Sequence, residues 1–363
     1  MKLAIIYSDK RGKYVSQGCS TFCDVVEYDL SSIMPRWWQK PLSAIISYHW
    51  DRKHWQNDFY RNPLAIYFRK VSGESFIKEN IVKVDAVLQF GVMTYYDYQI
   101  LGNPNIYYYH DGAYDWNNPY WLSPRYGKRF CNNQRKWLIK ACRIFTFSEW
   151  ARKQHIYERS ISQEKVFNVG WGPCIPLKNE FVKQKNIAKK FIFIGGEPWR
   201  KGLDILLQAF KQLTQKYNNI SLDVIGTKDN EFTKYSTSNV IFHGYCDANK
   251  IINILSSNDI FVLPSRYERA GHATIEAMWY GLPVIVTNTC GLPEPVNNSG
   301  CGYVIKSESV QELENAMISL IETPQLVMEM SKKAIISSRD SWTWDKTCER
   351  IIREIQNSLC DTK

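Results

Sequence analysis

Residues 264–283 read PSRYERAGHATIEAMWYGLP and directly follow the apolar run Ile260–Leu263. This order predicts a buried strand, then a loop, then a helix that begins just after Gly271. The Gly-Leu-Pro sequence that closes the stretch is a stop signal for that helix. Because strands that alternate with helices form parallel sheets, the stretch predicts an α/β fold.

The same stretch carries the chemistry of a binding site. Glu268 and Glu276 lie eight residues apart, with Gly271 between them. Backbone N–H groups and the helix dipole at the start of a helix favour an anion, phosphate above all. Carboxylates at the same place can hold the hydroxyl groups of a sugar or a ribose. The pattern therefore predicts a ligand that bears both phosphate and hydroxyl groups.

The rest of the second half repeats the alternation of strands and helices. Further strands are expected at Phe191–Ile194, Leu222–Gly226, Val240–Gly244 and Val284–Thr287, and helices at Leu203–Leu213 and Ile251–Leu255. Such alternation indicates a parallel sheet that is covered by helices on both faces.

The first half is less regular but of the same kind. Buried strands are expected at Leu3–Tyr7, Ala44–Ser47, Ala86–Phe90, Ile106–Tyr109 and Ile144–Phe147, and helices at Arg135–Ala141 and Glu149–Tyr157. We therefore predict an N-terminal domain over residues 1–172, a linker over 173–188 and a C-terminal domain over 189–340. Residues 341–363 are expected to hold a last helix near Thr347–Leu359.

The charge of the chain is concentrated in its first half. The net charge is +10, and residues 1–180 hold 25 Lys and Arg against 16 Asp and Glu, together with nine of the thirteen tryptophans. A basic, aromatic-rich half predicts contact with a polyanion or an anionic membrane surface. The segments that combine tryptophan or tyrosine with basic residues are Met34–Pro41, Arg52–Trp55 and Arg125–Arg129.

Other features of the composition bear on location. No apolar run approaches the ~18 residues of a transmembrane helix. The first nine residues read as a buried strand rather than as a signal peptide. The ten cysteines follow no metal-binding spacing, so free thiols in a reducing compartment are expected. These observations favour a cytoplasmic protein with peripheral contact on the inner face of the membrane.

The glutamate stretch resembles the donor-site signature of retaining GT-B glycosyltransferases, the large family 4 group also called glycosyl transferases group 1. In that signature two glutamates are separated by seven residues and a glycine lies between them, as Glu268, Gly271 and Glu276 do here. Residues 277–285 continue the similarity. The resemblance implies two doubly wound Rossmann-like domains that face a cleft. It also implies a nucleoside-diphosphate sugar as donor, UDP- or GDP-linked, and a glycan or glycolipid acceptor.

The resemblance extends to other residues. Gly195–Gly202, which reads GGEPWRKG, is similar to the family's loop that grips the donor diphosphate, and Lys201 matches directly. Gly196 stands where the family usually has an arginine, so Arg200 is the candidate replacement. His110 ends a predicted strand where the family places a histidine near the transferred sugar. The remaining donor-binding positions that the resemblance implies are Gly18, Gly244, Tyr245, His272 and Ala273.

The resemblance also implies a mechanism. Lys201, Arg200 and the helix amides near Gly271 would stabilise the charge on the departing diphosphate. Glu276 would hold the ribose hydroxyls and Glu268 a hydroxyl of the donor sugar. No Asp-x-Asp metal motif occurs in the sequence, so no metal is expected. No side chain stands out as a nucleophile, which fits front-side attack with retention of the anomeric configuration.

Three alternatives stay open at this point. The first is another GT-B enzyme, either an inverting transferase that uses His110 as a general base or a sugar-nucleotide epimerase. The second is a binding protein that keeps the fold without catalysis. The third, a nucleic-acid binder, has only the +10 net charge in its favour and no motif.

Overall fold

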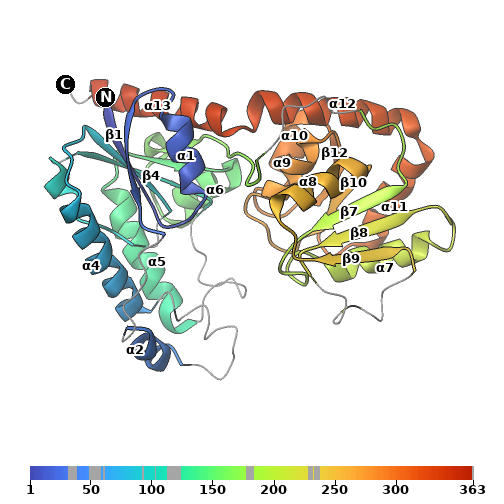
Figure 1. Ribbon diagram of the computed structural model, residues 1–363, viewed down its shortest axis with the longest axis horizontal. Coiled ribbons are helices and arrows are strands. Elements are labelled where there is room, and N and C mark those ends of the chain that lie inside the picture. Colours follow the sequence, from blue (N-terminus) through green and yellow to red (C-terminus); the bar gives the residue numbers. More distant parts are fainter. Residues whose placement is uncertain are drawn as a thin grey trace. The chain divides into compact units, whose positions relative to one another are not determined.

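The computed structural model (Figure 1) describes residues 1–31, 39–48, 59, 62–91, 94–102, 104–112, 124–176, 184–227, 232 and 238–361. These residues form two compact units. The first unit comprises Met1–Gly170 together with Thr347–Lys363, and the second comprises Trp171–Lys346. The end of the chain therefore folds with the unit that contains its beginning. The division after residue 170 lies close to the predicted boundary at residue 172.

Within the described residues, the first unit contains a six-stranded parallel sheet in the order β2-β1-β3-β4-β5-β6. Its strands are β1 (Lys2–Tyr7), β2 (Asp24–Asp29), β3 (Ala86–Phe90), β4 (Asn105–His110), β5 (Arg143–Thr146) and β6 (Val166–Asn168). Its helices are α1 (Gly12–Cys19), α2 (Gln39–Ile46), α4 (Pro63–Glu79), α5 (Pro124–Ile139), α6 (Glu149–Lys153) and most of α13 (Trp344–Asp361). Short turns are η1 (Gln99–Leu101), η2 (Gln154–Glu158) and η3 (Gln163–Lys165).

The described part of the second unit also contains a six-stranded parallel sheet, in the order β12-β11-β10-β7-β8-β9. Its strands are β7 (Lys190–Ile194), β8 (Ser221–Ile225), β9 (Val240–Gly244), β10 (Ile260–Leu263), β11 (Val284–Thr287) and β12 (Gly302–Ile305). Its helices are α7 (Leu203–Leu213), α8 (Ala248–Ser257), α9 (His272–Trp279), α10 (Glu294–Ser299), α11 (Val310–Glu322) and α12 (Pro324–Ser341).

The central strands are apolar and buried along their whole length. Every residue of β3, β10 and β11 is buried, and only the first residue of β1 is partly exposed. Continuous apolar runs of this kind suit strands that are covered on both faces, as parallel sheets require. α7 supplies such a cover in the second unit, because its buried face includes Leu206, Phe210 and Leu213.

The strand order contains one point in each sheet where the direction of winding reverses. In the first unit that point lies between β1 and β3, and in the second unit it lies between β7 and β10. Loops that leave such neighbouring strands at their carboxyl ends diverge, and ligands of doubly wound sheets bind there. The strand order alone therefore predicts a ligand-binding site at the segments that follow β7 and β10.

One predicted strand of the first unit is wrong. Ala44–Ser47 is not a strand, because residues up to Ile46 belong to helix α2 and a turn follows. The edge strand is instead β2, whose sequence DVVEYD mixes apolar and charged residues. Four apolar residues are too few to separate a strand from a helix by periodicity. Helix α4 was not predicted either.

Candidate functional site

Two loops meet at the reversal point of the second sheet. One runs from β7 to α7 and the other from β10 to α9. Gly202 caps α7 with a left-handed backbone (φ +73), and a Cβ at this position would lie 1.9 Å from the carbonyl oxygen of Pro264. The backbone N–H of Arg266 donates to the carbonyl oxygen of Arg200 at 2.9 Å. The two loops are therefore in backbone contact, and only glycine fits at the point where they touch.

Arg266 fastens these loops together. Its guanidinium makes two 2.8 Å hydrogen bonds to the buried carboxylate of Asp204, in the first turn of α7. It also donates to the carbonyl oxygen of Trp199 at 2.6 Å and to Glu308 at 2.7 Å. Paired N–H···O bonds of this kind fix geometry as well as add stability. Arg266 lies within the stretch 264–283 and Asp204 within the predicted helix Leu203–Leu213, but neither residue was predicted to have a role.

A carboxylate between two cations forms the centre of the site. The Oε2 atom of Glu268 lies 3.2 Å from the Nζ atom of Lys201 and 3.3 Å from a guanidinium nitrogen of Arg200. Burial alone would raise the pKa of Glu268, but the charges of Lys201 and Arg200 outweigh it and lower the pKa to about 2. Glu268 is therefore ionised at every physiological pH and acts as a hydrogen-bond acceptor, not as an acid. Its stabilising contribution is lost only as the pH falls toward 2.

The two cations differ in how fully they are engaged. Arg200 donates to both carboxylate oxygens of Glu197, to the carbonyl oxygen of Tyr267 and to Glu268. Lys201 makes a single described contact, to Glu268, although an ammonium group has three N–H donors. Arg200 thus holds the loops and orients Glu268, whereas Lys201 keeps donors for a ligand. A Cβ on Gly195 would lie 2.5 Å from Lys201 Cδ, so this glycine makes room for the lysine side chain.

The start of α9 adds backbone donors beside this cluster. Gly271 caps the helix with a left-handed backbone (φ +78), and His272 and Ala273 are its first residues. No acidic residue occurs in the first turn to occupy the helix dipole. The Nδ1 atom of His272 donates to the carbonyl oxygen of Gly172 at 2.8 Å, which fixes the tautomer and the ring. The helix start is therefore suited to an anion.

Glu276 lies one turn further along α9 and is buried. Its Oε1 atom accepts the backbone N–H of Cys174 at 2.8 Å. Burial raises the pKa of Glu276, while the backbone N–H groups of Cys174 and Ile175 and the charge of Lys201 oppose that rise. A raised pKa means that holding this carboxylate ionised in the folded state reduces stability at neutral pH.

Glu276→Gln is therefore expected to lose activity without losing stability. The amide oxygen can still accept from Cys174, and the cost of the buried charge disappears. Because the pKa is raised, the wild type loses stability as the pH rises above the ordinary glutamate value, and the variant should not. Thermal unfolding of the unligated protein between pH 4 and 8 measures this. Glu314→Gln, at a buried carboxylate of α11 that pairs with Lys216, is the matched control. A large drop in melting temperature for Glu276→Gln alone would contradict the assignment.

Glycines and an exposed tyrosine surround the ends of the next strands. Gly196 follows β7, and Gly244 ends β9 with a left-handed backbone (φ +65). Tyr245 is 77% exposed, and its Cε1 atom lies 3.6 Å from where a Cβ on Gly196 would be. The exposed ring of Tyr245, beside Gly196, which has no side chain, offers a flat apolar surface on this edge of the sheet.

The remaining predicted residues lie in the first unit. His110 ends β4, is buried, and its Nδ1 atom donates to the carbonyl oxygen of Gly112 at 2.9 Å. The His155 ring packs edge-on against it at 4.6 Å, a neighbour that the sequence analysis did not identify. Gly18 lies in the last turn of α1 and not in the loop after β1, where Gly12 begins the helix. The structure brings Lys201, Arg200 and Glu268 together with the start of α9.

The described residues hold no group of three or more His, Cys, Asp or Glu side chains that could bind a metal ion. No described helix is both long enough and apolar enough to cross a membrane.

Comparison with known proteins agrees with this architecture. Sucrose-phosphate synthase from Thermosynechococcus elongatus has a similar structure, with a TM-score of 0.69 at 14% sequence identity, covering 99% of this chain and 100% of that chain. The fold is therefore that of the GT-B glycosyltransferases, as predicted. Residues 178–336, which lie within the second unit, match the family model of glycosyl transferases group 1.

Many relatives match part of the chain, among them the following two proteins. An uncharacterized 41.2 kDa protein in the cps region of Klebsiella pneumoniae is 31% identical over 144 residues, which is 39% of this chain and 38% of that protein. The lipopolysaccharide glucosyltransferase WaaG of Escherichia coli is 29% identical over 163 residues, which is 41% of this chain and 43% of that protein. Each of these two matches spans less than half of the relative's own length.

Proposed function

We propose that this chain is a retaining glycosyltransferase that moves a sugar from a nucleoside-diphosphate sugar to a hydroxyl group of a glycan or glycolipid. The observation that carries the proposal is the position of Lys201 and Glu268 beside the start of α9, at the reversal point of the second sheet. The group 1 family match over this region and the name of the lipopolysaccharide glucosyltransferase among the relatives support it.

In this proposal the residues of the second unit act on the donor. Lys201 and the amides of His272 and Ala273 stabilise the negative charge that develops on the departing diphosphate. Glu268, held ionised, accepts a hydrogen bond from a hydroxyl group of the donor sugar. Glu276 accepts from the ribose. Arg200 positions Glu268 rather than contacting phosphate, because its donors already engage Glu197, Tyr267 and Glu268. For His110 the resemblance alone supports a site role.

The proposed reaction proceeds by front-side attack. The bond between the anomeric carbon and the diphosphate oxygen breaks, and a bond from that carbon to the acceptor oxygen forms on the same face. The acceptor proton passes to the departing diphosphate, which serves as the base. Glu268 is too strongly acidic to take this proton, since its pKa is about 2.

A screen of sugar nucleotides for thermal stabilisation tests the proposal. A ligand that binds the folded state raises the melting temperature by mass action, and the effect reaches ~2.7 kcal/mol at a hundredfold excess over Kd. UDP- and GDP-sugars are the first to try. Anomer analysis of the product then separates a retaining from an inverting transferase. Transfer to an acceptor, as against interconversion of the sugar nucleotide, separates a transferase from an epimerase. Stabilisation without turnover would identify a binding protein.

Activity is expected to be independent of a divalent metal. Lys201 and the start of α9 supply the positive charge that a metal would otherwise provide. Initial rates in EDTA should equal those in buffer alone, and added magnesium or manganese should not raise them. Complete loss of activity in EDTA, restored by either metal, would refute this part of the proposal.

We further propose that the first unit contacts an anionic membrane surface. Helix α2 exposes Leu42, Ile45 and Ile46 on one face, at 44%, 73% and 39% exposure, next to Lys40. An exposed apolar face beside basic residues is typical of interfacial helices. Most of Met34–Pro41 and all of Arg52–Trp55 lie outside the described residues, as do the side chains of residues 125–127.

Flotation with liposomes tests the membrane proposal. Binding should require anionic lipid and weaken as salt rises, because each basic residue near such a surface contributes ~1 kcal/mol that salt screens. Ile45→Ser should reduce binding. Ile336→Ser is the matched control, because Ile336 is 50% exposed on α12 of the second unit. If the protein did not bind anionic liposomes at low salt, the membrane proposal would be wrong, and an acceptor outside the membrane would be favoured.

A further inference from the structure

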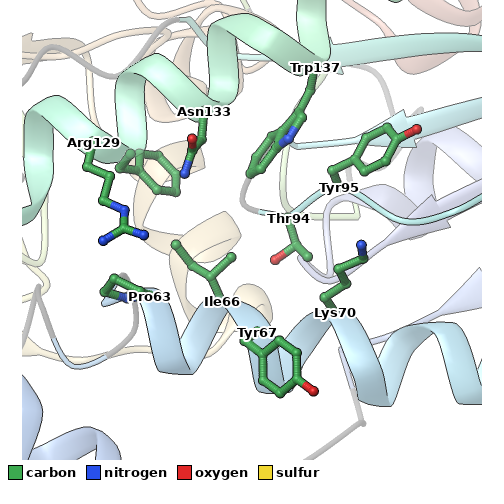
Figure 2. A pocket seen from close by; sticks show the side chains of 10 residues that line it. Pro63, Ile66, Tyr67, Lys70, Thr94, Tyr95, Arg129, Asn133 and Trp137 are labelled. Carbon is green, nitrogen blue, oxygen red and sulfur yellow. The ribbon is translucent and has the colours of Figure 1, made fainter.

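A cavity of about 220 Å³ lies in the first unit between the N-terminal half of α4 and residues 129–137 of α5 (Figure 2). Tyr67 and Lys70 line it from α4, and Arg129 and Trp137 line it from α5. Its volume is below the ~300–1,000 Å³ of typical small-molecule sites, so it suits a single ring-sized group. None of the residues described above as the donor site contributes to it.

The cavity lies at the carboxyl edge of the first sheet. Thr94, which follows β3, lines both this cavity and a smaller one at the ends of β1 and β3, where the winding of the sheet reverses. The Thr94 side chain is buried, and its Oγ1 atom makes no hydrogen bond of good geometry within the described residues. The Tyr96 hydroxyl is its neighbour, and this contact partly opposes the rise that burial causes in the pKa of Tyr96. A buried hydroxyl of this kind is a point where a ligand gains a hydrogen bond.

Aromatic rings form one side of the cavity. Trp137 stacks on Tyr95 with ring centroids 6.1 Å apart and an angle of 23° between the planes. Figure 2 shows the indole of Trp137 directed from α5 into the cavity. Tyr67, which is 59% exposed, borders it from α4. Flat aromatic surfaces of this kind pack against the apolar C–H faces of a sugar ring.

The charges around the cavity are of one sign. Arg129 and Lys70 lie at opposite ends of it in Figure 2, and no carboxylate is among its lining residues. Lys70 is 3.6 Å from Glu74 and lies over the Tyr95 ring, so part of its charge is already balanced. Arg129 has no carboxylate within ion-pair distance among the described residues, and Asn133 follows it one turn later on the same face of α5. The end formed by Arg129 and Asn133 therefore favours an anion.

We propose that this cavity binds one negatively charged sugar unit of the acceptor, with its carboxylate or phosphate at Arg129 and its ring against Trp137. The inference rests on the proposed glycosyl transfer and specifies the acceptor. A purely apolar occupant would leave Arg129 and the Thr94 hydroxyl unused, and a simple anion would leave the aromatic surface unused. Arg129 also belongs to the basic segment Arg125–Arg129, which was predicted to contact a polyanion or an anionic membrane surface, and its place beside this cavity favours an anionic ligand over the membrane.

Calorimetric titration of the full chain without donor tests the proposal. The probes are methyl glucuronoside, glucose 6-phosphate, neutral methyl glucoside and inorganic phosphate. Both charged sugars should bind about tenfold more tightly than the neutral sugar, as one charge-assisted contact provides. They should also bind more tightly than inorganic phosphate. Arg129→Gln should remove the preference for the charged sugars and leave the neutral sugar unaffected.

Lys136→Gln is the matched control, because Lys136 is an exposed lysine of the same helix that does not line the cavity. Equal binding of charged and neutral sugars would overturn the proposal. The proposal would also be overturned if inorganic phosphate bound as tightly as glucose 6-phosphate. It would be overturned as well if Lys136→Gln lost the preference for charged sugars to the same extent as Arg129→Gln. Stabilisation of the same preparation by sugar nucleotides separates the two hypotheses. If sugar nucleotides stabilise the protein and charged sugars do not bind, the proposed acceptor site is wrong and the proposed donor site stands. If charged sugars bind and sugar nucleotides do not stabilise the protein, the proposed donor site is wrong and the cavity still binds charged sugars.

Discussion

Lys201→Ala is expected to lower the turnover of sugar transfer by about two to three orders of magnitude, or ~2.7–4 kcal/mol of transition-state stabilisation. The lysine is the cation of the cluster whose donors are not all engaged, and it lies 3.2 Å from Glu268 beside the start of α9. Its loss should act on the departing diphosphate rather than on the fold, because Arg200 still pairs with Glu268. Initial rates with saturating donor measure the effect.

The control for this variant is Lys211→Ala, which removes an exposed lysine from the last turn of α7 and should leave turnover unchanged. The melting temperature of both variants should stay near that of the wild type. Near-normal turnover of Lys201→Ala would show that the diphosphate does not bind beside α9. Loss of turnover together with loss of folding would assign Lys201 a structural role instead.

Gly202→Ala is expected to unfold the second unit or to destabilise it by about 3 kcal/mol or more. The left-handed backbone at φ +73 costs an alanine ~1–2 kcal/mol, and the added Cβ would lie 1.9 Å from the Pro264 carbonyl oxygen. Relieving that overlap requires the two loops to separate, and overpacking of a fitted interior typically costs ~1–3 kcal/mol more. Denaturant unfolding followed by far-UV circular dichroism measures the change.

Gly244→Ala separates the two causes. This glycine also has a left-handed backbone, at φ +65, but nothing lies within 4 Å of an added Cβ. It should show the backbone cost alone. If the two variants were destabilised equally, the contact between the loops would contribute nothing measurable.

The sequence predicted what depends on short stretches of chain. Strands such as Ala86–Phe90 and Ile260–Leu263 are short and mainly apolar runs. The start of α9 is indicated by Gly271 and the few residues that follow it. The candidate donor-site residues of the second unit could be proposed for the same reason. Ala44–Ser47 failed because four apolar residues suit a helix as well as a strand.

Partners that are distant in sequence could not be predicted. Arg266 and Asp204 are 62 residues apart, and nothing in either segment indicates the other. The engagement of Arg200 by Glu197 and Tyr267 likewise depends on how two loops meet, and the sequence did not indicate it. The contact of Arg200 with phosphate stays a prediction. The cavity beside Trp137 combines two helices and a loop that share no motif, and only the folded chain brings them together.

The hydrogen bond between the Cys174 amide and Glu276 gives the chain a built-in reporter. The amide belongs to the segment that begins the second unit, and its acceptor lies 102 residues further along the chain. A hydrogen-bonded amide exchanges its hydrogen with solvent mainly when its bond opens. Any ligand that draws Glu276 away from this amide will quicken its exchange, and any ligand that holds the carboxylate in place will slow it. The occupancy of a site on α9 can thus be read from a backbone position that no ligand needs to touch.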